Sequence, residues 1–199
     1  MISDIFKPAV VRIISPTAKG MLRIGLTPNS VTAIGAIGVV ATGLITYPSG
    51  HLFGGTIAIC LLALSDLFDG TMARLSENGP SRWGGFLDST IDRVTDSAIA
   101  AGLLVYLAQK DDPLSYVLLV SIVAGFLVSY IRAKAESLQI ECKGGFAERT
   151  ERLIILLTAI GLTGLGIKYV LPIGIWFLAV ASSYTVLERM RIVRKATKQ

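Results

Sequence analysis

Four aspartates stand at positions in the sequence where carboxylates are rare. Asp66 and Asp69 follow a long apolar run, and Asp88 and Asp92 lie near the start of the next one. Spacings of three and four residues place each pair on one face of a helix. A carboxylate inside a membrane helix costs roughly 2.5–3.5 kcal/mol on insertion scales, so we expect all four to be functional.

The segment between the two pairs is centred near Asn78 and Gly79. Residues equally far from the centre of an antiparallel helical hairpin lie at equal depth, so the sequence predicts that the four carboxylates converge at one end. They would repel one another unless cations lay between them. Carboxylate oxygens favour Mg²⁺ or Mn²⁺, and two ions about 3.5–4 Å apart would suit phosphoryl chemistry. A solvated acidic patch is the alternative, which the uncharged run over residues 53–65 disfavours.

Six apolar segments supply the helices that must hold these carboxylates. Each is close to the ~20 residues that cross a bilayer core. Hydrophobic residues make up 52% of the chain, and the mean hydropathy is +0.64. The segments run over residues 28–47, 52–73, 84–107, 114–135, 147–167 and 169–187. We predict an all-α integral membrane protein with a single domain, residues 1–199, in which residues 28–195 form a bundle of six transmembrane helices.

The first 22 residues differ from these segments. Apolar residues from Ile2 to Ile14 recur at three- and four-residue spacing, and Asp4, Lys7 and Arg12 interrupt them. This pattern predicts an N-terminal amphipathic helix, residues 1–22, that lies in the membrane interface. The first turn of a globular helix is the alternative.

Lysines and arginines gather on one side of the predicted bundle. Of the 19, only Lys110 and Lys168 lie on the other side. The positive-inside rule therefore places both termini and the aspartates on the cytoplasmic side of the cell membrane. We expect no nucleic-acid binding from the net charge of +5, because the basic residues are scattered over loops beside apolar helices.

The residues around the aspartates spell a long motif. The chain reads DLFDGTMAR over residues 66–74 and GGFLDSTID over residues 84–92. This resembles the signature of CDP-alcohol phosphotransferases, DxxDGxxAR followed by GxxxDxxxD, and every fixed position is present. The resemblance covers essentially the whole chain and implies a phosphatidyltransferase of phospholipid biosynthesis.

The resemblance also implies a role for each motif residue. The metal ligands would be Asp66, Asp69, Asp88 and Asp92, and Asp92 would also act as the catalytic base. The CDP-lipid would contact Asn29, Thr32, Asp66, Asp69, Gly70, Ala73, Arg74 and Gly84. Two Mg²⁺ or Mn²⁺ ions would bridge the diphosphate of CDP-diacylglycerol, an acceptor hydroxyl would attack the lipid-side phosphorus, and CMP would leave.

A second set of basic residues bears on the acceptor. It lies at the ends of the fourth and sixth apolar segments and at the start of the fifth: Arg132, Lys134, Arg149, Arg152 and Arg189. Such a set could bind an acceptor that carries its own phosphate, although ordinary positive-inside charge is the alternative. The same segments resemble phosphatidylinositol phosphate synthases of actinobacterial type, which implies inositol phosphate as the acceptor. Thr150 stands where those enzymes commonly have proline.

Other functions could also place carboxylates in membrane helices. Within the family, glycerol 3-phosphate as acceptor or an archaeal CDP-lipid as donor would use the same chemistry. Outside it, a small transporter or cation channel would line an ion path with carboxylates, but these aspartates all lie at one end of the predicted bundle. A structural membrane scaffold would explain none of them. The resemblance also implies a homodimer.

Overall fold

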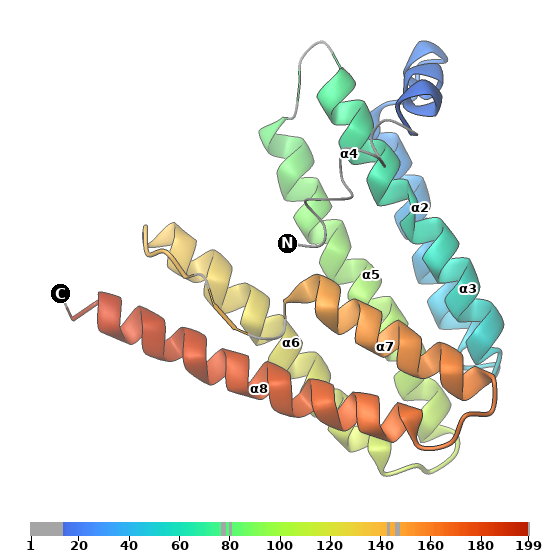
Figure 1. Cartoon of the computed structure of the whole chain (residues 1–199), viewed down its shortest axis with the longest axis vertical. Helices are drawn as coiled ribbons and strands as arrows, with labels where there is room; N and C mark the ends of the chain where they lie inside the picture. The colour runs from blue at the N-terminus through green and yellow to red at the C-terminus, as the bar shows by residue number, and fades with distance from the viewer. Residues whose placement is uncertain (1–13, 77–78, 80, 143, 146–147, 199) are drawn as a thin grey trace. The chain divides into compact units, whose positions relative to one another are not determined.

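The structure is a computed structural model that describes residues 14–76, 79, 81–142, 144–145 and 148–198 (Figure 1). Within these ranges all regular secondary structure is helical, which confirms the predicted all-α class. A helix over residues 14–23 comes first. The others are α2 (Pro28–Thr46), α3 (Leu52–Ala63), α4 (Ser65–Leu75), α5 (Arg82–Ala108), α6 (Leu114–Ser137), α7 (Arg149–Gly164) and α8 (Val170–Ala196).

Local signals explain where α2 begins and ends. Thr27 Oγ1 accepts a hydrogen bond from the backbone N–H of Ser30 at 3.2 Å, and Pro28 takes the first helical position, where its missing N–H costs nothing. After the helix, Gly50 reverses the chain with a φ of 80°. Tyr47 anchors this turn, since its fully buried side chain shares a 3.0 Å hydrogen bond with the Thr56 hydroxyl.

The second predicted segment, residues 52–73, forms two helices, α3 and α4, separated at Leu64. The N–H of Leu64 bonds to the carbonyl of Leu61 at 3.3 Å, and the N–H of Leu67 bonds to the carbonyl of Leu64 at 3.0 Å. Bonds of this three-residue span tighten a helix locally. The break comes just before Asp66, so the first aspartate pair lies on its own short helix.

Within the part of the chain that the structure describes, four helical segments are long and apolar enough to cross a membrane by length and composition: Pro28–Thr46, Leu52–Leu75, Leu114–Ser137 and Val170–Ala196. The other two predicted spans, which form α5 and α7, are helical but do not meet the same criterion of length and apolar composition. Helix α5 has 27 residues and carries several charged ones. Helix α7 has 16 residues, because Gly166 ends it in a left-handed conformation, with φ of 85°, inside a Schellman motif.

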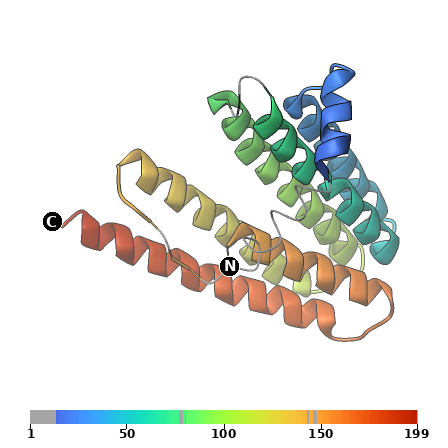
Figure 2. The same ribbon diagram turned by 45° about the horizontal axis from the view of Figure 1, so that its top comes forward.

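The chain divides into two compact units, residues 1–43 with 57–99 and residues 44–56 with 100–199. In the second unit α8 packs along both α6 and α7 (Figure 2). Helices α7 and α8 approach closely at Gly174, where a Cβ atom would lie 2.8 Å from that of Ala159. All the predicted metal and CDP-lipid residues belong to the first unit, and all the predicted acceptor residues belong to the second.

In the first unit, the helix over residues 14–23 packs against α2 and α4. Its Ala18 is fully buried against Val31 and Met72, and Ile14 and Leu22 extend this apolar contact. Residues 1–13 of the predicted amphipathic helix lie outside the described residues. An apolar face of the helix over residues 14–23 therefore packs against α2 and α4 and helps to hold α4 in position.

Candidate functional site

Asp69 is the buried carboxylate of the candidate site. It lies on α4, is 7% exposed, and accepts a hydrogen bond from the Thr32 hydroxyl of α2. The carboxylates of Asp66 and Asp88 lie close enough to repel it electrostatically. A buried carboxylate that faces further negative charge is a natural ligand for a cation.

The other predicted ligands are more accessible. Asp66 and Asp88 are exposed, and Asp92 is half-buried. Among the described residues, no three or more His, Cys, Asp or Glu side chains form a group already spaced to hold a metal. Like charges favour rotamers that spread such side chains apart. The structure therefore places the four aspartates in one unit, with Asp66 and Asp88 acting electrostatically on Asp69, but it does not gather their side chains into a metal-binding group. Carboxylate oxygens are the ligands that a hard divalent cation such as Mg²⁺ or Mn²⁺ prefers.

Arg93 lies beside the candidate base on α5. Its Nη2 atom is 3.8 Å from Asp92 Oδ2 and 3.7 Å from Asp96 Oδ2. The guanidinium therefore interacts with two carboxylates of the same helix. The sequence analysis did not identify Arg93 or Asp96, although their three-residue spacing on a helix is a known ion-pair pattern.

The hydrogen bond from Thr32 of α2 to Asp69 of α4 requires the two helices to lie close together. Two glycines of α2 allow this close approach. A Cβ atom on Gly35 would lie 2.8 Å from Ser65 Cβ, and one on Gly38 would lie 2.9 Å from Leu62 Cδ2. Larger residues would force the helices apart at both places. The sequence analysis missed this contact, and small residues spaced along an apolar helix are the signal that could have revealed it.

The predicted CDP-lipid residues occupy a more open part of the first unit. A Cβ atom on Gly70 would meet no described heavy atom of a neighbouring element within 4 Å. A Cβ atom on Gly84 would lie 3.5 Å from Asn29 Oδ1, so α2 and α5 bring these two residues side by side. Ala73 is half-buried, and the exposed Arg74 donates to Thr71 Oγ1 at 3.4 Å.

The predicted acceptor residues have unequal surroundings in the second unit. Arg132 and Lys134 are exposed on α6, and Arg132 Nε donates to Glu136 Oε1 at 3.0 Å. Arg149 and Arg152 are half-buried at the start of α7. The Arg152 side chain crosses α6 at Gly125, where a Cβ atom would lie 3.4 Å from Arg152 Nε.

Arg189 has a structural role that the sequence analysis did not predict. It is 3% exposed, and it donates from Nε to the carbonyl of Gly144 at 3.0 Å and from Nη1 to the carbonyl of Val128 at 2.7 Å. These bonds connect α8 to α6 and to the segment before α7. They use two of the five N–H donors of a guanidinium.

Known proteins resemble this chain over nearly its full length. A family model described as CDP-alcohol phosphatidyltransferase matches residues 25–187. The phosphatidylinositol phosphate synthase of Mycobacterium tuberculosis (strain ATCC 25618 / H37Rv) is 41% identical, over 94% of this chain and 88% of the relative. The enzyme of the same name from Streptomyces avermitilis is 40% identical, over 100% of this chain and 85% of the relative.

Solved structures agree with these relatives. The crystal structure of the M. tuberculosis synthase with CDP-DAG bound has a TM-score of 0.85 and 41% identity, covering 92% of this chain and 94% of that one. The structure of the same synthase with manganese and citrate has a TM-score of 0.86 and covers 90% and 88%. Together with the apolar helices and the complete motif, these matches show that the chain belongs to the CDP-alcohol phosphatidyltransferase family, as a multi-pass membrane enzyme of phospholipid biosynthesis.

Proposed function

We propose that this enzyme transfers the phosphatidyl group of CDP-diacylglycerol to inositol phosphate and releases CMP, with two divalent metal ions in its active site. The observation that carries the proposal is buried Asp69, held by Thr32 and flanked by Asp66 and Asp88 inside the family motif. Relatives named phosphatidylinositol phosphate synthase support the choice of acceptor. The relative's complexes with CDP-DAG and with manganese support the donor and the metal.

The proposed metal ligands are Asp66, Asp69, Asp88 and Asp92. Divalent cations bound there would neutralise the diphosphate charge and polarise the phosphorus under attack. Thr32 would orient the Asp69 carboxylate through its hydrogen bond, as partners of metal ligands commonly do. The open space beside Gly70 and the adjoining pair Asn29 and Gly84 would admit the CDP moiety, with Ala73 and Arg74 at its edge.

Asp92 is the proposed general base. Its carboxylate would accept the proton of the acceptor hydroxyl while that oxygen bonds to the lipid-side phosphorus. The bond from this phosphorus to the oxygen of CMP would break, and CMP would leave with the bonding electrons. Arg93 would hold the Asp92 carboxylate in position for this transfer.

The proposed topology has six membrane crossings and a cytoplasmic active site. Helices α5 and α7 would complete the bundle with the four long apolar segments, and the N-terminal segment would lie at the interface. The uneven distribution of lysine and arginine supports cytoplasmic termini. CDP and the acceptor are soluble in water, while the acyl chains require lipid, so a site at the membrane surface suits both. A homodimer is proposed from the family resemblance.

Gly70 offers a test of the donor site in which stability and activity change in opposite directions. Gly70→Ala should stabilise the protein by about 0.5–1 kcal/mol, because alanine favours a helix and the Cβ meets open space. The same methyl group should raise the KM for CDP-diacylglycerol by occupying space needed by the donor. Gly54→Ala is the matched control, since Gly54 is an exposed helical glycine of α3 with equally open surroundings. Equal donor KM values in both variants would remove Gly70 from the donor site.

The acceptor is tested with CDP-diacylglycerol, Mg²⁺ and one acceptor at a time: inositol phosphate, free inositol, glycerol 3-phosphate or serine. We expect inositol phosphate to be the best substrate. Lys134→Gln should raise its KM roughly ten- to a hundredfold and leave the donor KM unchanged, because a charged hydrogen bond contributes about 1.5–3 kcal/mol. Lys198→Gln, a change of the same exposed residue type near the C-terminus, is the control.

Two outcomes would change the proposal. If free inositol reacts as well as its phosphate, the basic residues of the second unit reflect membrane topology, and they do not bind a phosphate. If glycerol 3-phosphate reacts best, the enzyme is a phosphatidylglycerophosphate synthase with the same donor chemistry.

A further inference from the structure

A cavity of about 490 Å³ lies in the second unit, and none of the residues that line it is used by the proposed reaction. Its walls come from the turn between α5 and α6, the turn between α7 and α8, and the helix ends beside them. It therefore lies at the opposite end of α6 from Arg132 and Lys134. Its volume is in the range of ordinary small-molecule sites.

The cavity is lined by the two basic residues that the sequence sets apart from all others, Lys110 and Lys168. Lys110 Nζ donates to Tyr106 Oη at 2.7 Å and lies 4.3 Å from the centre of that ring. Asp112 also lines the cavity, but its Oδ1 accepts the backbone N–H of Leu114 at 2.9 Å and so caps α6. Two ammonium groups against one carboxylate leave the lining with a net positive charge.

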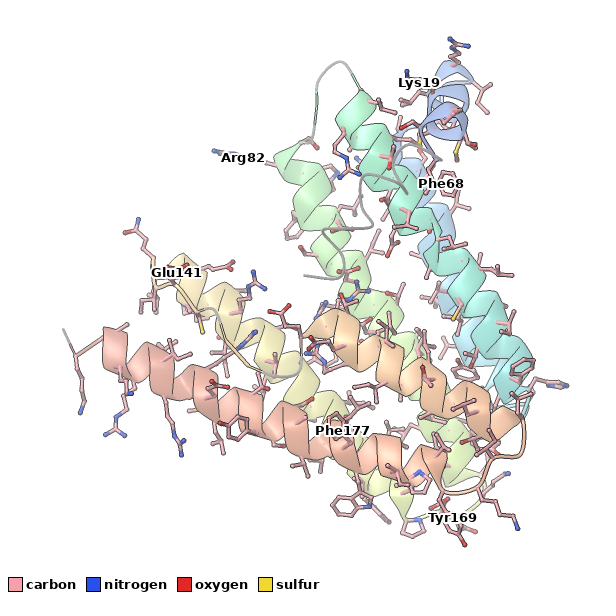
Figure 3. All side chains as sticks on the ribbon, in the orientation of Figure 1. Lys19, Phe68, Arg82, Glu141, Tyr169 and Phe177 are labelled. Carbon is pink, nitrogen blue, oxygen red and sulfur yellow. The ribbon has the colours of Figure 1, made fainter. Side chains whose placement is uncertain are left out.

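The remaining walls are apolar or aromatic. Leu107 and Leu171 form its buried floor, while Ile167, Tyr169 and Trp176 are 46%, 75% and 57% exposed and are accessible to a ligand. Figure 3 shows Tyr169 at the turn that leads into α8. Aromatic side chains of this kind are typical of the membrane–water interface. A small hydrated anion would gain nothing from the apolar walls, whereas an acyl chain would.

The start of α8 adds to the attraction for a negative group. The helix begins at Val170, and its first-turn residues Leu171 and Pro172 line the cavity. The positive end of its dipole therefore adjoins the cavity. The C-terminal ends of α5 and α7 also adjoin the cavity with the negative ends of their dipoles, and each is followed by one of the lysines, whose positive charge offsets that end.

We propose that this cavity binds an anionic phospholipid, with its headgroup phosphate at Lys110 and Lys168 and the upper part of an acyl chain against the exposed side chains of Ile167 and Trp176. In the proposed topology this lipid belongs to the leaflet away from the cytoplasm. The site is separate from the donor and acceptor sites of the reaction. It would bind lipid whether or not the assignment of the acceptor is correct.

Trp176 is a built-in reporter for this site. The chain has two tryptophans, so Trp83→Phe leaves Trp176 alone. The variant is reconstituted in phosphatidylcholine nanodiscs that contain a small fraction of brominated lipid, and quenching of Trp176 fluorescence is measured. We expect brominated phosphatidylglycerol to quench at about tenfold lower mole fraction than brominated phosphatidylcholine, from the attraction of two lysines for an acidic lipid.

Double lysine variants, made in the Trp83→Phe protein, test whether the preference for phosphatidylglycerol depends on Lys110 and Lys168. Lys110→Gln with Lys168→Gln should abolish the preference for phosphatidylglycerol, and Lys110→Arg with Lys168→Arg should keep it. Lys195→Gln with Lys198→Gln removes the same charge at the other end of α8 and should also keep it. Unchanged CMP release by the first pair would show that the enzyme remains folded.

Three results would overturn the proposal. The first is equal quenching by the two brominated lipids in Trp83→Phe alone. The second is a preserved preference in Lys110→Gln with Lys168→Gln, which would mean that the lysines serve only the ends of α5 and α7. The third is loss of the preference on addition of millimolar inorganic phosphate, which would identify a site for a free anion.

Discussion

Asp69→Asn should reduce CMP release from CDP-diacylglycerol below detection, a loss of more than roughly 10³-fold. The amide removes the charge of the one buried carboxylate in the motif, which Thr32 holds in place. Asp66→Asn and Asp88→Asn should have the same effect, because these carboxylates act electrostatically on Asp69 and are proposed to share its metal ions. A chelator added to the unmodified enzyme should do likewise, and excess Mg²⁺ should restore its activity. CMP release is measured in each case with saturating inositol phosphate.

Two further variants make this result specific. Asp96→Asn removes a carboxylate of α5 that pairs with Arg93 and lies outside the motif, so most of the activity should remain. Thr32→Val removes only the hydroxyl that bonds to Asp69, and it should raise the half-saturating Mg²⁺ concentration roughly ten- to a hundredfold. Substantial turnover by Asp69→Asn, or by the parent enzyme in chelator, would contradict the metal site.

Asp92→Asn should reduce turnover by roughly 10²–10⁴-fold, the usual effect of losing a general base. Binding of CDP-diacylglycerol should change little, because Asn has nearly the same shape and the other three aspartates remain. Donor affinity is measured by equilibrium binding, and turnover is measured separately by CMP release. If affinity and turnover fall together, Asp92 is chiefly a metal ligand and another group accepts the proton.

Features set by neighbouring residues in the chain could be predicted well from the sequence. The start of α2 followed from Thr27 and Pro28, because capping and proline geometry act within one turn. The two aspartate pairs were placed on helices by their spacing, and α4 and α5 carry them in one unit. The family was evident because the motif fixes residues at so many positions.

Features set by tertiary packing could not be predicted in this way. The close approaches of Gly35 to Ser65 and of Gly38 to Leu62 depend on how α2 packs against the residues on either side of Leu64. Arg189 resembled a surface cation in the sequence, and only the backbone of α6 and the segment before α7 give it two buried acceptors. The length of α7 was overestimated because apolar composition continues past the Schellman motif at Gly166.

The predicted convergence of the aspartates shows the same limit. Helical spacing sets which backbone positions share a face, but it does not set side-chain rotamers. Repulsion between carboxylates favours separated rotamers, and a bound cation favours convergent ones. The helices that carry the four aspartates were therefore predictable, while the distances between their carboxylate oxygens were not.

The most direct test of metal-dependent phosphatidyl transfer by this site measures CMP and the lipid product together in one reaction. Purified enzyme is incubated with CDP-diacylglycerol, Mg²⁺ and inositol phosphate, and both products are quantified over time. We expect one CMP for each phosphatidylinositol phosphate formed, and neither product when the acceptor, the metal or the Asp69 carboxylate is missing. CMP release that continues without an acceptor, or lipid product that forms in the presence of chelator, would contradict metal-dependent phosphatidyl transfer by this site.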